Sequence, residues 1–439
     1  MIPIRAWAIA AMAALPLPAF AAVEIQEVTS PGGIEAWLVE EHSIPFIALE
    51  LQFEGGAALD RPGKRGAVNL MTGLLEEGAA DRDARAFAEA TEDLAARFGF
   101  DAGQDSVSIS AEFLTETTPE AIALLRDALV SPRFDDAAVE RVRDQVLAVL
   151  AQDATDPDAI ASSTFQALSF PDHPYGSVID GTVETVSALT ADDLRDAHAD
   201  ALTRDRVRVG VTGDITAAEL GPLLDKLLGD LPATGGDVVP EADKLLEGGI
   251  TVVDFPSPQS VVFFGHEGIA FDDPDYFPAY ILNHILGGAG FESRLMAEVR
   301  EKRGLTYGIG TFLAPRDHAA QWMGQFSSSN DKTAEAVRLV REEWARLASD
   351  GVSAAELEQA KTYLTGAYPL RFDGNSRIAG ILVGMQSLSL GVDYIPGRND
   401  RIMAVTAEDV ARVAARLLRP DDLHFVVVGQ PDDLSTEGF

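Results

Sequence analysis

The sequence predicts an α+β chain of two homologous domains, each a β-sheet with helices packed on one face. Three observations lead to this prediction: the 439-residue length, an internal duplication, and strands grouped ahead of helices in each copy. Single cores rarely grow beyond roughly 250–300 residues, so a chain of this length needs more than one. With 46% hydrophobic and 24% charged residues, the chain is globular and has enough apolar side chains for two cores.

The duplication is clearest in the unit that closes each half. The segment TADDLRDAHADALTRDRVRVGVTGDI, from Thr190, aligns without a gap with TAEDVARVAARLLRPDDLHFVVVGQP, from Thr406. Each copy opens with T-x-x-D, in which the hydroxyl caps a free helix amide and the acid lies at the positive helix end. Each continues through a turn into a Val-rich strand that ends at Gly213 or Gly429. This shared register indicates two copies of one domain.

Residues 232–249, PATGGDVVPEADKLLEGG, form the predicted linker, because they are rich in Pro, Gly and acids. The linker would separate an N-terminal domain, 22–231, from a C-terminal domain, 250–439. Strands come first in each domain and helices follow, without strict βαβ alternation, which favours α+β domains. The expected strands are 36–40, 46–54, 251–255 and 260–265, and the expected helices are 118–130, 137–153, 332–349 and 353–368.

The N-terminal residues 1–21 have the anatomy of a secretory signal peptide. Arg5 precedes an apolar run, and Ala19-Phe20-Ala21 forms an A-x-A-like cleavage site. The run is shorter than the ~20 residues of a membrane span, so we expect cleavage after about Ala21 and no membrane insertion. The expected location is periplasmic or secreted. The chain has no cysteine, so disulfides and thiolate metal sites are excluded.

The net charge of −36 comes from acids spread along the chain. Such a surface repels phosphate backbones, so nucleic acid is not an expected partner.

Four segments in order resemble the insulinase (pitrilysin-like) metallopeptidase family along nearly the whole mature chain. They are HSIPFIALELQFEGGA from His42, HPYGSVIDGT from His173, GGAGFESRLMAEVREKRGLTYGIG from Gly287, and the duplicated closing unit. The third segment is the most specific. The resemblance implies the insulinase-type fold, with two such domains in the short bacterial members. We expect His173 to fix a turn.

Active members of the family carry an inverted zinc motif, H-x-x-E-H, in which two His on one helix face share Zn²⁺ and the Glu polarises the attacking water. Here the motif falls in GAVNLMTGLLEEGA, with Asn69 and Gly73 at the His positions and Thr72 at the Glu position. The resemblance places the third, acidic ligand at Ala148 or Val149. We therefore expect no metal and no cofactor on this chain.

We expect no other residues to replace the lost ligands. No two of the seven histidines are spaced four apart on one helix. Glu76 and Glu77 lie near the motif, but carboxylates without imidazole hold zinc poorly, so we interpret them as surface acids.

The second domain keeps the other half of the family's active site. The resemblance implies that an Arg and a Tyr, spaced R-x6-Y, reach the opposite half and hydrogen-bond the substrate backbone and the oxyanion. In EVREKRGLTYG these are Arg300 and Tyr307, with Gly304 turning the helix into the following strand.

Three glycines precede this segment: Gly287, Gly288 and Gly290. In non-catalytic subunits of the mitochondrial processing members, a glycine-rich loop helps to select substrate. The glycines are therefore candidate substrate contacts, with a flexible helix–helix turn as the alternative.

Loss of the metal half beside retention of Arg300 and Tyr307 predicts the non-catalytic, zinc-less subunit of an exported metallopeptidase heterodimer. Zinc would lie on a homologous partner that carries H-x-x-E-H, and the substrate would be an unfolded peptide. Two alternatives stay open: a stand-alone zinc metallopeptidase with an atypical site, and a structural scaffold subunit with no catalytic role.

Overall fold

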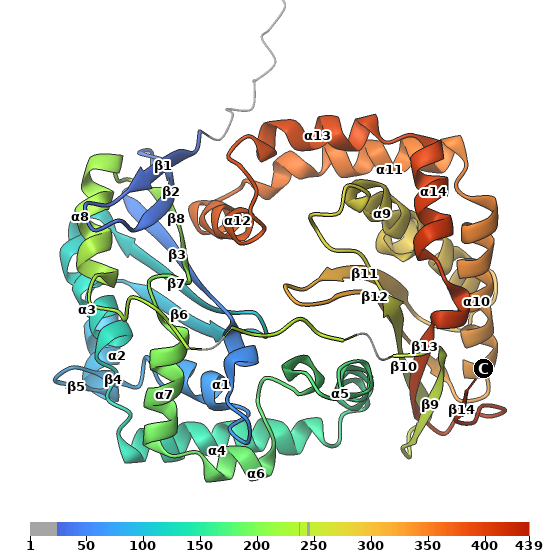
Figure 1. Cartoon of the computed structure of the whole chain (residues 1–439), viewed down its shortest axis with the longest axis horizontal. Helices are drawn as coiled ribbons and strands as arrows, with labels where there is room; N and C mark the ends of the chain where they lie inside the picture. The colour runs from blue at the N-terminus through green and yellow to red at the C-terminus, as the bar shows by residue number, and fades with distance from the viewer. Residues whose placement is uncertain (1–23, 237, 244–245, 439) are drawn as a thin grey trace, which may run out of the picture.

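The computed structural model describes residues 24–236, 238–243 and 246–438, so the predicted signal peptide lies outside the described residues. Two six-stranded sheets lie at opposite ends of the long axis, and each has helices on its outer side (Figure 1). The α+β fold class is thus confirmed. Within the described residues, no helix is both long and apolar enough to cross a bilayer.

The first sheet has the order β1-β2-β8-β3-β7-β6. Only β2 and β8 run parallel within it. The alternating sequence FIALELQFE of β3 buries Leu49, Leu51 and Phe53 in the first core, because alternate side chains of a strand share a face. The strands are β1 (Gln26–Thr29), β2 (Glu35–Glu40), β3 (Phe46–Glu54), β6 (Arg97–Ala102), β7 (Ser106–Leu114) and β8 (Val207–Gly213).

The second sheet repeats this arrangement. Its order is β11-β12-β10-β13-β9-β14, and again only one pair, β13 and β9, is parallel. The two sheets differ in the edge strand beside the parallel pair. In the first sheet this is β1, from the start of the described chain, and in the second it is β14, near the C-terminus. The strands are β9 (Gly249–Asp254), β10 (Gln259–Glu267), β11 (Ile309–Pro315), β12 (Ala320–Ser329), β13 (His424–Gly429) and β14 (Glu437–Gly438). The internal duplication is therefore present in three dimensions.

Local capping sets the helix starts as the sequence predicts. Thr190 and Thr406 accept hydrogen bonds from the amides of Asp193 (3.3 Å) and Asp409 (3.1 Å), which begins the two corresponding helices α7 and α14. The capping box of Ser353 begins α11.

The helices of the first half are α1 (Ala67–Thr72), α2 (Ala84–Asp93), α3 (Thr118–Val130), α4 (Asp136–Asp153), α5 (Pro157–Ser169), α6 (Val183–Ala188), α7 (Ala191–Ala201) and α8 (Ala217–Leu228). Those of the second half are α9 (Tyr276–Asn283), α10 (Thr333–Asp350), α11 (Ala354–Gly366), α12 (Asn375–Ser387), α13 (Tyr394–Ala404) and α14 (Ala407–Leu417). A small hairpin joins β4 (Gly78–Ala79) to β5 (Arg82–Asp83).

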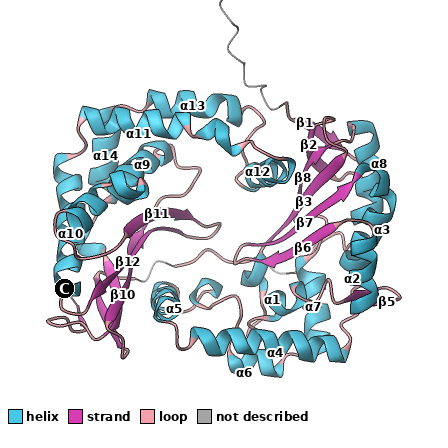
Figure 2. Cartoon of the chain, turned by 180° about the vertical axis from the view of Figure 1, so that it is seen from behind, coloured by secondary structure: helices cyan, strands magenta, loops and turns pink. Residues whose placement is uncertain are grey.

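Each half contributes one helix that packs on the sheet of the other half, an arrangement that the sequence did not reveal. Helix α12 of the second half lies against the inner face of the first sheet, and α5 of the first half lies against the second sheet (Figures 1 and 2). Gly210 on β8 permits the first contact, because an added Cβ would lie 2.3 Å from the carbonyl oxygen of Ala379 on α12. The ring of Phe165 on α5 makes the second, 5.1 Å from that of Phe263 on β10. The boundary at 232–249 stays a prediction, and packing links the halves on both sides of it.

Candidate functional site

The helix that carries the degenerate motif is held at its start by a buried carboxylate. Asp60 accepts hydrogen bonds from the backbone amides of Gly66 and Val68, each at 2.8 Å. Gly66 has φ 90°, a left-handed conformation that favours glycine, at the N-cap of α1. Burial raises the pKa of Asp60 to about 6. These contacts fix α1 independently of any metal.

The three motif positions do not fit zinc. The amide nitrogen Nδ2 of Asn69 donates to Oδ1 of Asp180 at 3.0 Å, and the hydroxyl of buried Thr72 donates to the carbonyl of Val68 at 2.8 Å. Gly73 has no side chain, and an added Cβ would meet Val142 of α4 at an ordinary contact distance of 3.4 Å. These three positions do not form a zinc ligand set. The Asn69 amide is bonded to a carboxylate, the Thr72 hydroxyl is bonded to its own helix, and Gly73 offers no ligand atom.

The third-ligand positions supply no acid. Ala148 and Val149 are exposed on α4, and Val149 is 45% exposed. Throughout the described part of the chain, no group of three or more His, Asp or Glu side chains is arranged to hold a metal ion. The residues at the motif therefore do not support a metal-dependent catalytic step on this chain.

The two acids that follow the motif differ in their exposure, and only Glu76 is a surface group as predicted. Glu76 is exposed, and Glu77 forms an ion pair with Arg141 of α4. A different carboxyl, Glu50 on β3, has a large shift, because burial and the nearby Asp101 raise its pKa to about 7. Sequence reasoning missed Glu50, although an acid at the centre of a mostly apolar strand was visible in FIALELQFE.

Arg300 lies in an irregular helical segment that leads to β11. A π-helix, His284–Gly288, extends α9, a 3₁₀ turn covers Gly290–Glu292, and a second π-helix, Met296–Glu301, carries Arg300. The Arg300 guanidinium lies over the Phe291 ring, 4.9 Å from its centroid. Among the described residues Arg300 forms no ion pair, whereas the adjacent cations Lys302 and Arg303 both pair with Glu298.

Tyr307 lies in the turn just before β11 and is 88% exposed. Thr306 fixes this turn, because its Oγ1 donates to the Ser327 carbonyl at 2.7 Å and accepts from the Gly308 amide at 3.1 Å. Gly304 has φ 60°, which is the left-handed turn that the sequence predicted between helix and strand. In the described part of the structure, the Tyr307 hydroxyl has no hydrogen-bond partner.

The three glycines differ in their surroundings. Gly287 is buried, and an added Cβ would lie 2.4 Å from Oγ1 of Thr311, so this glycine lets the π-helix pack against β11. It is therefore a packing residue in this structure, and its role as a substrate contact stays a prediction. Gly288 and Gly290 are exposed, and Gly290 has φ 56° with open space around it. These two stay candidate contacts.

The HPYG segment forms the predicted turn and also a junction that the sequence did not indicate. Nδ1 of His173 accepts from the Tyr175 amide at 3.1 Å, and its Nε2 lies 2.8 Å from the Pro240 carbonyl in the predicted linker. The buried Tyr175 hydroxyl accepts from the amide of His318, in the β11–β12 loop, at 3.1 Å. One turn thus holds the first half, the linker and the second half together.

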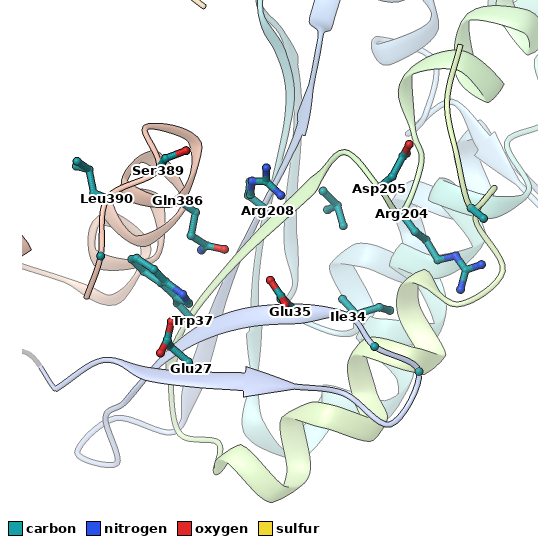
Figure 3. Close-up of a pocket in the computed structure, with 15 residues that line it drawn as sticks. Glu27, Ile34, Glu35, Trp37, Arg204, Asp205, Arg208, Gln386, Ser389 and Leu390 are labelled. Carbon is teal, nitrogen blue, oxygen red and sulfur yellow. The ribbon is translucent and has the colours of Figure 1, made fainter. Parts of the chain in front are cut away.

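A cleft of about 720 Å³ opens between β1, β2, β8 and the C-terminal end of α12 (Figure 3). Trp37, Glu35 and Arg208 line its strand side, and Gln386 lines its helix side. Arg208 pairs with Glu54 at 2.8 Å, and the Gln386 side chain donates to a β8 carbonyl at 2.8 Å. Arg208 and Gln386 are thus already engaged with the protein, and the cleft lies where α12 packs on the sheet.

Fold and site together define a duplicated α+β chain of the metallopeptidase type whose motif helix lacks the metal ligands. Two family models match it: Insulinase (Peptidase family M16) at residues 37–181, and Peptidase M16 inactive domain at residues 188–364. The chain belongs to the insulinase family.

Similar proteins span nearly the same length. The "Non-peptidase homolog YmxG" of Helicobacter pylori is 27% identical over 89% of this chain and 90% of its own. The "Probable mitochondrial-processing peptidase subunit beta" of Schizosaccharomyces pombe is 26% identical over 87% of this chain and 86% of its own. A Pseudomonas fluorescens crystal structure, titled as a peptidase M16 inactive domain, superposes with a TM-score of 0.88 at 27% identity, covering 95% of this chain and all of that one.

Proposed function

We propose that this protein is the non-catalytic, zinc-less subunit of an exported insulinase-family metallopeptidase heterodimer. The names of the Helicobacter and Pseudomonas proteins support a non-catalytic chain, and the name of the Schizosaccharomyces protein describes a subunit of a larger assembly. A homologous partner would carry H-x-x-E-H and the zinc, and the substrate would be an unfolded peptide.

One observation carries the proposal: the metal half of the site is absent while two hydrogen-bond donors remain available in the other half. Arg300 forms no ion pair and the Tyr307 hydroxyl has no partner among the described residues. Donors with no internal partner can serve a ligand without first breaking a bond in the protein.

Each donor has a defined task in this proposal. Arg300 would bind carbonyl oxygens of the peptide backbone through its fork of N–H groups. Tyr307 would donate to the oxyanion that forms when the partner's site attacks the peptide bond. This chain would supply no nucleophile and no metal, because Asn69, Thr72 and Gly73 do not provide them.

Metal analysis and peptide cleavage test the first part. The purified chain should carry no stoichiometric zinc and leave reduced, carboxymethylated casein intact. Addition of the zinc-bearing chain should give cleavage. One tightly bound zinc per chain, removable by a chelator with loss of activity, would instead establish the stand-alone peptidase.

Two variants in the reconstituted pair test the second part. Tyr307→Phe removes one hydroxyl donor and little volume, so kcat should fall about 10²–10³-fold. Arg300→Ala should reduce kcat at least as much, since it also removes a cation. Tyr363→Phe, at a 59% exposed tyrosine of α11, is the matched control and should keep the wild-type rate. Zinc content and subunit association should not change. Wild-type turnover in an assembled Arg300→Ala, Tyr307→Phe double variant would exclude the catalytic role of both residues and favour the structural scaffold subunit.

Export is tested at the N-terminus. The mature protein recovered from the periplasm or medium should begin at about Ala22, as expected for a cleaved signal peptide. A chain that keeps Met1 inside the cell would contradict this part of the proposal.

A further inference from the structure

An aromatic ring, instead of a carboxylate, holds the side chain of Arg300. The guanidinium carbon lies 4.9 Å from the centroid of the Phe291 ring, which is within the ~6 Å range of a cation–π contact. Phe291 is 66% exposed, so its ring does little for the hydrophobic core. A large exposed apolar side chain in this position suggests a role at the surface.

Glu301, the next residue, is exposed and forms no ion pair with Arg300 among the described residues, and two other acids close to it in the chain are engaged elsewhere. Glu298, in the same π-helix, accepts from Lys302 and from Arg303. Glu292, next to Phe291, accepts from Nε2 of Gln359 on α11 at 2.8 Å. Arg300 therefore keeps its positive charge without a neutralising partner in the described structure.

The chemistry of the two kinds of contact differs. A carboxylate that bound the guanidinium in its plane would occupy two of the five N–H donors. A ring contact restricts the side chain without a carboxylate that would occupy those donors, so they stay available to a ligand. An aromatic support thus suits an arginine that must bind a peptide carbonyl.

The backbone fixes the position of this ring. Gly290 adopts φ 56°, and its carbonyl accepts from both the amide and the hydroxyl of Ser293, at 3.1 and 2.8 Å. Ser293 is fully buried, and the Ala289 amide donates to the His284 carbonyl at 2.9 Å. The turn that presents Phe291 is therefore bonded on both sides of the residue.

We propose that Phe291 is a positioning residue for Arg300: it orients the guanidinium for the backbone of a bound peptide and leaves its charge and N–H donors available. This inference rests on the proposed function and deepens it. It assigns a defined role to one exposed side chain of the glycine-containing turn.

The first test separates the aromatic face from simple bulk. Phe291→Leu keeps an apolar side chain and removes the ring, and Phe291→Tyr keeps the ring. In the reconstituted pair, with carboxymethylated casein as substrate, Phe291→Leu should lower kcat/KM by about three- to thirtyfold. Phe291→Tyr should restore it to within about twofold of wild type. Tyr394→Leu, which removes a partly buried ring 5.3 Å from Arg401 on α13, is the control for loss of a cation–π contact elsewhere and should leave turnover unchanged.

The second test observes the contact itself in the chain without its partner. In an NMR spectrum of the arginine side chains, the Nε–H signal of Arg300, assigned by its loss in Arg300→Lys, should carry a ring-current shift. This shift should disappear in Phe291→Leu and persist in Phe291→Tyr. A signal that does not move in Phe291→Leu would refute the contact, whatever the activity.

A double-mutant cycle distinguishes this inference from the proposed function. In an Arg300→Ala background, Phe291→Leu should cause no further loss. Equal losses from Phe291→Leu in both backgrounds would overturn the positioning role while the role of Arg300 stands. Full activity of Phe291→Leu beside a crippled Arg300→Ala would do the same. Full activity of Arg300→Ala would instead refute the proposed function, and the positioning role with it.

Discussion

Removal of the Phe165 ring should destabilise both halves of the molecule, although Phe165 belongs to the first. The residue lies on α5, is fully buried, and packs against Phe263 of the second sheet with ring centroids 5.1 Å apart. Its ring also lies 3.1 Å from the position of a Cβ added at Gly265 on β10. The strands around it are bonded on both sides, so the site cannot collapse easily when the ring is removed.

The magnitude follows from this burial. Phe→Ala at a fully buried position costs about 3–5 kcal/mol, because the transfer free energy of the ring is lost and a cavity remains. We therefore expect Phe165→Ala to lower the free energy of unfolding by this amount. Phe312→Ala, at a 42% exposed residue of β11, is the control and should change it by about 0.5 kcal/mol or less.

The assay is hydrogen exchange followed by mass spectrometry across a urea series, which reports on each half separately. Amides of β3 in the first sheet and β10 in the second should lose protection at the same, lowered urea concentration in Phe165→Ala. Two results would refute this reasoning: a response confined to the amides of α5 and the first half, or a decrease in the free energy of unfolding below about 1 kcal/mol. Either would mean that the packing of α5 on the second sheet does not hold the halves together.

Two further predictions concern the carboxylates and the motif. The motif can be restored by Asn69→His, Thr72→Glu and Gly73→His, but this triple variant should not be a peptidase, because the third acidic ligand is missing. Adding Val149→Glu should raise the zinc affinity measured in metal titrations. Turnover by the triple variant alone would disprove the placement of the third ligand. Glu50→Gln should stabilise the protein at neutral pH. Burial raises the pKa of Glu50 from 4.5 to about 7, so the folded state keeps a proton that the unfolded chain releases, and the stability tied to this group is lost as the pH rises through that window. The stability advantage of Glu50→Gln should grow between about pH 4.5 and 7 in urea titrations, and an advantage that does not depend on pH would contradict the shift.

The sequence alone determined the features that depend on local contacts and on repeated patterns. Thr190 and Thr406 mark two helix starts, since a capping hydroxyl and an acid three residues later act within one turn. The aligned Val-rich strands after them predicted two copies of one sheet. The loss of the zinc ligands was visible at Asn69, Thr72 and Gly73, because the ability to bind zinc depends on residue type.

Only the tertiary structure decided which surfaces meet. The pattern of α5 shows an apolar face around Phe165, but a periodic pattern does not name the sheet that covers it, and the covering sheet belongs to the other half. Likewise Gly287 looks like a loop glycine until Thr311 of β11 is found against it. The support of Arg300 by Phe291 depends on two π-helical segments that change which side chains share a face, and residue spacing alone does not show such a change in helical register.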